Sequence, residues 1–371
     1  MNSAPITTVR RAVTGAAPLA PAELSESEID WLIETGFGPA LYAHIGKGLP
    51  NTPPPSRLHS ADLTARVLGA GMRTAAWAIV AACAARGDRL TVLKGIDVAT
   101  RYYPQAHWRL MRDIDLLVPA GALARTEGTL RGLGYVQRSH LPASFYASLH
   151  HSMPFYHPHS RVWVELHTAL FPPASALGRD PLFALNNIEA HSVAGDFHGH
   201  PVGYLRPELL LVYLAAHWGN SPSRIGGAVP LLDLALVLQR AGAHFDWPWL
   251  LATVHNSPAA NFLYLALSYL QRRGVIVLPP SVLRVLRTTQ TGVGYLTTRV
   301  LHGVVERLMV DSRAPRGIVS ESVLVITWRT LSARQRALAK YARLPWALAF
   351  PNHPDRFSLR YQWQRVRALW R

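Results

Sequence analysis

The sequence predicts an α/β protein in which helices precede and follow a small mixed β-sheet. Apolar residues alternate with polar ones over 113–118 and again over 161–167, the period of a strand with one buried face. An alanine-rich helical pattern covers 61–86, and helical patterns dominate from Pro207 onward. We therefore expect three parts: an N-terminal leader and helical region (1–88), a core that holds the sheet (89–204) and a C-terminal helical domain (205–371).

The N-terminal part is predicted to form helices that pack on the rest of the protein, and it contains no recognisable catalytic or ligand-binding motif. Residues 1–22 are rich in alanine, proline and threonine without periodicity, so we interpret them as a leader. Ser25 to Glu28 has the pattern of a capping box that begins a helix, which Gly36 ends. Three consecutive prolines within 50–56 predict a connector before the helix at 61–86.

The core and the C-terminal part follow with distinct periodicities. His217 and Asp233 are polar residues inside apolar helices, and we interpret them as a buried pair between helices. The expected core elements are strands at 90–93, 113–118, 161–167 and from Tyr135, helices at 96–103 and 122–133, and a hairpin at 197–204. The expected C-terminal helices are 209–217, 230–239, 249–255, 261–272 and 282–307.

Two aspartates in the strand at 113–118 are the strongest chemical signal. Asp113 and Asp115 are two residues apart, so both project from the same strand face. Adjacent carboxylates repel each other, and a divalent cation is the usual remedy. The alternative is a pair of solvated carboxylates that pair with Arg109 and Arg112.

Positive charge and a glycine precede these aspartates. Lys94 and Gly95 end a short apolar run and begin a helix, and Arg109 follows that helix. Because glycine lets a phosphate approach the backbone and a helix N-terminus favours negative charge, the segment predicts a phosphate site. Together with the aspartates, it predicts a metal-dependent phosphate site.

A third carboxylate lies in the strand at 161–167. Trp163, Glu165 and His167 share one face of that strand. A two-metal phosphoryl or nucleotidyl transfer site requires such an acid on a neighbouring strand, so Glu165 is a candidate third metal ligand and proton acceptor beside Asp113 and Asp115. The alternative is a salt bridge on an exposed sheet face.

These motifs resemble the uncharacterised nucleotidyltransferase family, a branch of the polymerase-β superfamily. The resemblance lies in Leu93-Lys94-Gly95, Arg109 and Asp113 to Val118, then in Val164 to His167, Pro207 to His217, and Leu231 to Asp233 with Trp247 downstream. It implies Mg²⁺ (or Mn²⁺), an NTP as substrate, and transfer of an NMP to a hydroxyl or similar acceptor on a small molecule or peptide. One departure is that Lys94-Gly95 stands where the superfamily usually has a Gly-Ser or Gly-Gly pair.

Histidines gather between the second and third predicted core strands. The segment from His150 to His159 lacks the helical spacing or paired cysteines of known zinc sites. It resembles a histidine-rich stretch that precedes the family's third-carboxylate strand, which implies that His151 touches phosphate or the acceptor. We interpret His157 and His159 as polar loop residues.

Charge and cysteine content leave other functions open. The formal net charge is +16, of which +10 lies in 299–371, and arginine greatly outnumbers lysine, as in GC-rich bacterial genomes. Nucleic-acid binding through this basic part is an alternative, although we favour a helix at 357–370 docked on its own protein. A single cysteine and no predicted transmembrane segment indicate a cytoplasmic protein. The rival functions are a catalytically retired scaffold and a toxin that modifies tRNA.

Overall fold

The structure, a computed structural model, describes residues 11, 24–46, 54–139, 141, 143–146, 149–220, 229–289, 302, 303 and 305. The expected leader at 1–22 lies outside these residues except for residue 11. The docked helix expected at 357–370, and all but three residues of the basic part at 299–371, also lie outside them.

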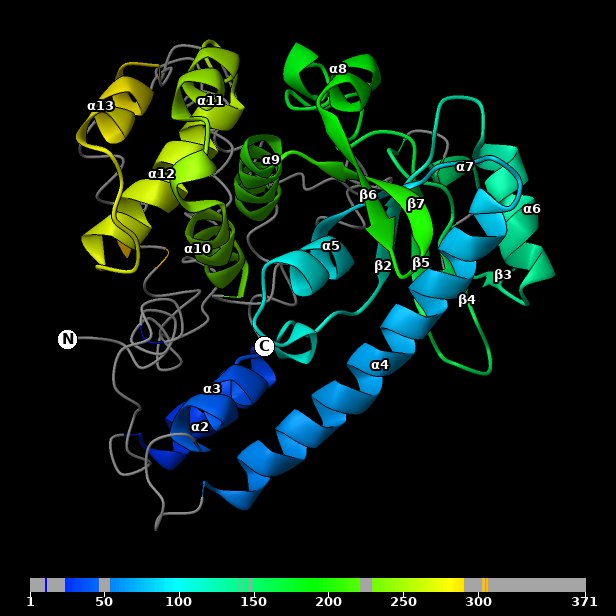
Figure 1. The fold of residues 1–371 in the computed structure, drawn as a ribbon, viewed down its shortest axis with the longest axis horizontal. Helices are drawn as coiled ribbons and strands as arrows, with labels where there is room; N and C mark the ends of the chain where they lie inside the picture. The colour runs from blue at the N-terminus through cyan, green and yellow to red at the C-terminus, as the bar shows by residue number, and fades with distance from the viewer. Residues whose placement is uncertain are drawn as a thin grey trace, which may run out of the picture.

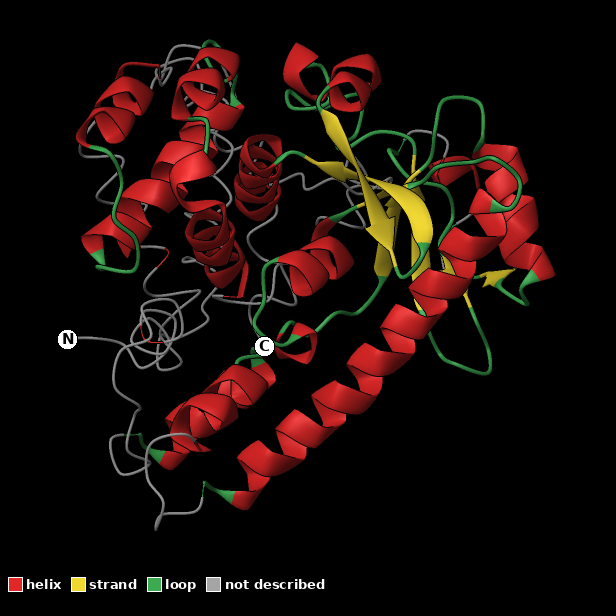
Figure 2. Ribbon diagram, viewed as in Figure 1, coloured by secondary structure: helices red, strands yellow, loops and turns green. Residues whose placement is uncertain are grey.

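A seven-stranded mixed sheet forms the centre of the core, which confirms the predicted α/β class (Figures 1 and 2). In the middle of the sheet, β2 pairs parallel with β5 and antiparallel with β1, and β1 pairs parallel with β7. The strand order is β3-β4-β5-β2-β1-β7-β6. The strands are β1 (Thr91–Val92), β2 (Ile114–Leu117), β3 (Val136–Gln137), β4 (Phe155–Tyr156), β5 (Trp163–His167), β6 (Ser192–Phe197) and β7 (His200–Leu205).

The two faces of the central strands differ as their alternation predicts. Ile114 and Leu116 of β2 and Val164 and Leu166 of β5 are fully buried in one apolar cluster with α4 (Ser56–Ala84) and α6 (Leu123–Gly132). The polar residues of both strands therefore emerge on the opposite face, near α5 (Lys94–Arg101) and α9 (Pro207–Asn220).

The N-terminal helices begin with the predicted capping box. Ser25 is the N-cap of α2 (Glu26–Glu34), and both reciprocal bonds between Ser25 and Glu28 are present. Helix α3 (Gly38–Gly46) follows and packs along α4. Helix α4 then runs as one long diagonal rod to the sheet, where it contacts β7 and α6 (Figure 1).

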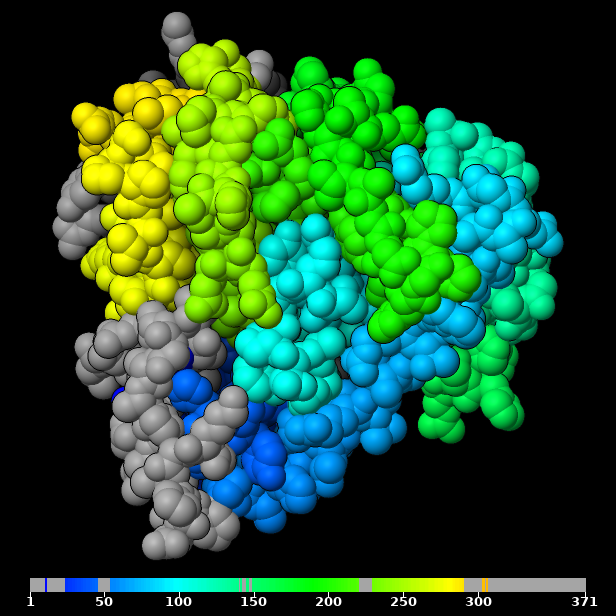
Figure 3. Space-filling model, in the orientation of Figure 1, coloured from blue at the N-terminus to red at the C-terminus, as the bar shows by residue number. Residues whose placement is uncertain are grey.

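Helices also follow the sheet, as predicted, and they pack beside α5 (Figure 3). One apolar cluster joins these helices to α2, α3 and one face of α5, so it contains residues from all three predicted domains. The helix expected at 282–307 ends at Thr289 in the described part of the chain. The remaining elements are α7 (Ala143–Tyr146), α8 (Leu185–Ala190), α10 (Val229–Ala241), α11 (Trp247–Thr253), α12 (Ala259–Arg272), α13 (Pro280–Thr289) and the 3₁₀ turns η2 (Ala106–Trp108), η3 (Pro181–Phe183) and η4 (Gly242–His244).

Within the described residues, α4 alone has the length and apolar composition that would let a helix cross a membrane, and 33% of its most apolar window is buried. Core helices of soluble proteins meet the same criterion, and α4 packs on α3, α6 and β7. Helix α4 meets the criterion through its many small apolar residues, and one such helix among the described residues is weak evidence against the sequence prediction of no transmembrane segment.

Candidate active site

The pairing of β2 with β5 brings two of the predicted carboxylates together. Asp115 and Glu165 are direct partners in this parallel pair, so their side chains stand side by side on the polar face. Leu117 and His167 are the next partners on that face. One ligand atom from each of Asp115, Glu165 and His167 lies within 4.8 Å of the other two, a grouping that suits a metal ion.

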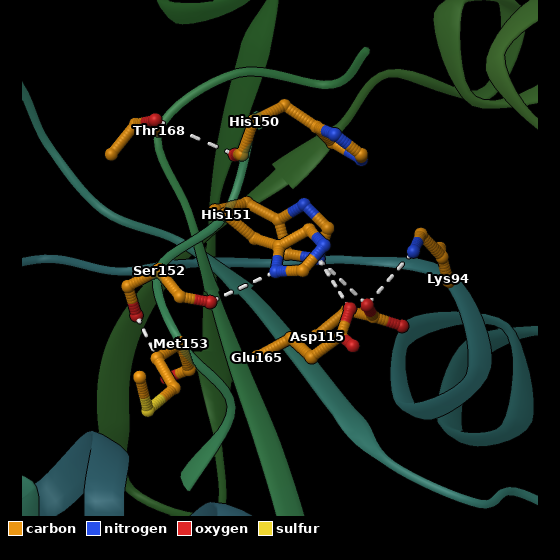
Figure 4. Close-up of polar contacts among 9 residues, drawn as sticks. Lys94, Asp115, His150, His151, Ser152, Met153, Glu165 and Thr168 are labelled. Carbon is orange, nitrogen blue, oxygen red and sulfur yellow. Dashed lines mark hydrogen bonds and ion pairs between the residues drawn. The ribbon is translucent and has the colours of Figure 1, made fainter. Parts of the chain in front are cut away.

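Asp115 lies at the centre of the polar network. Its Oδ1 accepts hydrogen bonds from Lys94 Nζ and His167 Nε2, each at 2.8 Å (Figure 4). Burial opposes the charge on Asp115, but Lys94 and His167 outweigh burial and lower the pKa of this carboxyl. Asp115 is therefore held as an anion although its side chain is only 5% exposed.

Asp113 has a different environment, because the strand predicted at 113–118 begins only at Ile114 and Asp113 lies just before it. Burial, and next the negative charges of Asp115 and Glu165, raise the pKa of Asp113 to about 7. No described residue donates a hydrogen bond to it or forms an ion pair with it, and neither aspartate pairs with Arg109 or Arg112. A divalent cation would relieve this repulsion, so the donor set fits a metal.

Glu165 and His167 complete the acidic face. His167 Nε2 lies 3.6 Å from Glu165 Oε2, and the ring of His167 is fully buried. Burial and the nearby Lys94 act against a charged imidazole, but the hydrogen bond to Asp115 and the nearby Glu165 carboxylate outweigh them and raise the pKa of His167. The pKa of Glu165 is lowered: burial disfavours the charge, but the interaction with the His167 imidazole 3.6 Å away outweighs burial.

Lys94 and Gly95 form the first turn of α5, beside Asp115. Lys94 has a φ of 44°, a left-handed conformation that costs a non-glycine residue about 1 kcal/mol or more. A Cβ on Gly95 would lie 3.0 Å from Met111 Cγ, so the backbone there packs closely. No described side chain caps this helix start, which leaves its amide groups available to an anion.

Arg109 and His151 are engaged in ways that sequence reasoning missed. The Nε of Arg109 donates to both carboxylate oxygens of Asp233, at 2.9 and 3.0 Å, and Tyr103 donates to the same carboxylate at 2.7 Å. His151 Nδ1 lies 2.9 Å from the carbonyl oxygen of Ser152, and its ring stands 5.5 Å from that of His167. The structure therefore places Arg109 at the cavity wall and His151 beside His167, outside the residues that line the cavity.

The predicted pair of His217 with Asp233 is wrong. Asp233 binds Arg109 and Tyr103, whereas His217 lines the site without a bond to Asp233. Burial first, and then the positive charge of Lys94, lower the pKa of His217 to about 3, so this imidazole is neutral. Tyr213 lies one turn earlier on α9, and this i, i+4 spacing of polar side chains in an apolar helix is the signal that could have placed both beside the site.

A cavity of about 380 Å³ opens beside the acidic face. Polar and apolar surfaces meet in it, because α9 and α10 contribute Leu214, Trp218 and Val229 opposite the carboxylates. Six of the seven predicted site residues line this cavity, and His151 does not; the six are Lys94, Gly95, Arg109, Asp113, Asp115 and Glu165.

Comparison with known proteins identifies the family. The family model described as uncharacterised nucleotidyltransferase matches residues 26–273, about two thirds of the chain. The chain belongs to this nucleotidyltransferase family. The predicted resemblance is thereby confirmed, and the matched residues include the sheet, the acidic face and the helices α9 to α12.

Two solved structures of the antibiotic-resistance factor ANT(2″)-Ia are also similar to part of the chain. A crystal structure with adenylyl-2″-tobramycin covers 51% of this chain and 95% of that one, and a solution structure covers 55% and 98%. Both have 16% identity and a TM-score of 0.35, values too low to say anything about the substrate of this nucleotidyltransferase. No curated protein matches the chain.

Proposed function

We propose that this nucleotidyltransferase moves an NMP from an NTP to a hydroxyl or similar acceptor on a small molecule or peptide, with Mg²⁺ or Mn²⁺ bound at Asp113, Asp115 and Glu165. The observation that carries the proposal is the repulsion at Asp113, a half-buried carboxylate beside those of Asp115 and Glu165 in a protein of this family. When bound, two such ions neutralise the triphosphate and lower the pKa of the attacking hydroxyl.

The residues around the cavity have distinct roles in this proposal. The amide groups at the start of α5, with Gly95, hold the triphosphate, and Lys94 supplies positive charge next to it. Arg109 acts on the nucleotide from the cavity wall while Asp233 fixes its orientation. The apolar wall formed by Leu214 and Val229 suits the base or the acceptor.

The chemical step is an in-line displacement at the α-phosphorus. The acceptor oxygen forms a bond to that phosphorus as the bond to the β-phosphate oxygen breaks, and pyrophosphate leaves. Glu165 takes the proton of the acceptor hydroxyl, which its 24% exposed side chain can reach from the cavity. The lowered pKa of Glu165 keeps it ionised and ready to accept this proton.

The test compares wild type with the variant D113N/D115N. Calorimetric titration with Mg²⁺ and a non-hydrolysable NTP should show binding by wild type and a large loss by the variant. The rate at which NTP is hydrolysed to NMP and pyrophosphate, measured with α-labelled NTP, should be about 10³-fold or more lower in the variant. Arg112→Gln, which removes an exposed charge from the same cavity wall, is the matched control and should retain most binding.

The outcomes separate the proposal from its rivals. Equal binding of Mg²⁺–nucleotide by wild type and D113N/D115N would refute the metal assignment. Nucleotide binding without any transfer to water or to candidate acceptors would favour a retired scaffold. Transfer to tRNA in preference to small molecules would favour the toxin-like alternative.

A further inference from the structure

We propose that His167 is a direct metal ligand together with Asp115 and Glu165, and that its nitrogen makes this site prefer Mn²⁺ to Mg²⁺. The inference rests on the proposed function, since it concerns the ion at the same acidic face. It adds a nitrogen ligand to the predicted set of three carboxylates.

The distances around His167 are those of ligands that share one ion. Its Nε2 lies 2.8 Å from Asp115 Oδ1 and 3.6 Å from Glu165 Oε2, and all three ligand atoms lie within 4.8 Å of one another. Adjacent ligands on an ion with bonds of about 2.1 Å stand roughly 3.0–3.4 Å apart. An ion can therefore take the place of the shared proton with small shifts of the side chains.

The surroundings of His167 keep its Nε2 pointed at the carboxylates. The ring is fully buried, and the rings of His150 and His151 stand 5.2 and 5.5 Å away. Its backbone is fixed on both sides, because His167 pairs with Leu117 in β2 and forms an isolated bridge with His151. A buried ring between fixed neighbours gives a preorganised ligand.

The kind of ligand decides which ion the site prefers. Mg²⁺ favours oxygen ligands and dehydrates reluctantly, whereas imidazole nitrogen suits transition ions and their affinities rise from Mn²⁺ onward. Two carboxylates with one imidazole form a mixed site that still accepts Mn²⁺ readily. Coordination through Nε2 releases its shared proton to solvent, while Lys94 keeps its own bond to Asp115 Oδ1.

The alternative is that His167 only orients the two carboxylates by hydrogen bonds while Asp113 and Asp115 hold the ion. The two roles differ in one observable, since only a ligand places its nitrogen in direct contact with the metal. Mn²⁺ is paramagnetic, so pulsed electron paramagnetic resonance detects a coordinated nitrogen directly and without turnover.

The experiment loads the full-length protein with Mn²⁺ alone and records the nitrogen coupling, first with natural histidine and then with ¹⁵N-labelled histidine. We expect a coupling in wild type that changes with the label, its loss in His167→Gln, and its retention in His150→Gln. His150 is the matched control because it is a neighbouring, half-buried histidine whose ring lies 5.2 Å from that of His167 and which is not in the group of possible metal ligands. Calorimetry should give Mn²⁺ binding tighter than Mg²⁺ binding by on the order of ten-fold in wild type and by much less in His167→Gln.

A wild-type spectrum without histidine coupling, or equal affinities for the two ions, would overturn the proposal, and the labelled wild-type protein keeps this test valid even if His167→Gln does not fold. Loss of coupling in His150→Gln but not in His167→Gln would also overturn it. NTP turnover with Mg²⁺ is measured separately. Turnover without histidine coupling would leave the proposed function intact and refute only the role of His167.

Discussion

Two aspartates that are two residues apart, one just before β2 and one within it, have opposite electrostatic states. Asp115 accepts bonds from Lys94 and His167, which lower its pKa and stabilise the anion. Asp113 has two negative neighbours and no such donor in the described part of the chain, and its pKa rises to about 7. Asp113 is therefore the residue whose charge most needs a cation.

This difference predicts how stability depends on pH in the metal-free protein. A carboxyl whose pKa is about 7 in the folded chain and about 3.9 in the unfolded chain costs stability as the pH rises through that window, and the full cost persists above it. Asp113→Asn removes this cost. Its melting temperature should exceed that of wild type at pH 8 and equal it near pH 4.

Asp115→Asn provides the opposite control. The lowered pKa of Asp115 means that its anion adds stability above the unfolded value, so this variant should melt below wild type at pH 8. Saturating Mg²⁺ should reduce the advantage of Asp113→Asn, because the ion binds the folded wild type. Identical melting curves for Asp113→Asn and wild type at pH 8 would show that Asp113 is not under repulsion.

The sequence alone predicts that these acids share a face but not how each is charged. Alternation places Asp113 and Asp115 together, and parallel pairing of β2 with β5 brings Glu165 opposite Asp115. The bonds from Lys94 and His167 depend on side-chain packing between residues 21 and 52 positions away. Local pattern carries no information about such contacts, so their effect on pKa required the structure.

At the scale of elements, periodicity predicts most helices and strands within a few residues. The capping box sets the start of α2, and alternation sets β2 and β5. The short strands β3 and β4, of two residues each, carry too little pattern for the sequence to predict their pairing. The sequence also does not predict which helix residues pack closely against another helix. Two glycines, one in α4 and one in α9, illustrate this.

Gly219 of α9 and Gly71 of α4 have opposite surroundings, so alanine should have opposite effects on them. A Cβ on Gly219 would lie 2.1 Å from Phe262 Cδ1, in the packed contact between α9 and α12, and nothing lies within 4 Å of a Cβ on Gly71. Gly219→Ala should lower the free energy of unfolding by about 1–3 kcal/mol through overpacking. Gly71→Ala should raise it by about 0.5–1 kcal/mol, because alanine favours the helix.

Urea denaturation of both variants measures these changes. If Gly219→Ala proves as stable as wild type, α9 and α12 are not packed as closely as the structure has them. The position of Tyr213 and His217 beside the carboxylates would then also be in doubt, since the same helix carries them.

At the scale of the whole molecule, a buried ion pair ties the C-terminal helices to the core. Arg109 follows η2 in the core, and Asp233 lies in α10, 124 positions later. Asp233 is 1% exposed and also accepts a bond from Tyr103 at the end of α5. The domain boundary expected near residue 205 stays a prediction. Both this ion pair and one continuous apolar cluster join residues on the two sides of that boundary.

Removing one member of this ion pair should lower the free energy of unfolding much more than replacing both members does. Removing one member of a buried pair leaves an uncompensated charge and typically costs 3–5 kcal/mol, whereas replacing both by apolar residues is often nearly neutral. We expect Asp233→Leu to lose about 3–5 kcal/mol of unfolding free energy. The double variant Arg109→Met with Asp233→Leu should recover most of it, apart from the loss of the Tyr103 bond.

A double-mutant cycle in urea, with calorimetric NTP titration of each variant, separates the structural role of Arg109 from its role in binding. If Arg109 acts on the nucleotide, the double variant should be stable yet bind Mg²⁺–NTP more weakly than wild type, by about 10-fold for one charged contact. The surface Arg131–Glu127 pair of α6 is the matched control, and its removal should change stability by less than about 1 kcal/mol. Wild-type nucleotide affinity in the stable double variant would show that Arg109 only joins α10 to the core, and it would remove Arg109 from the proposed binding site.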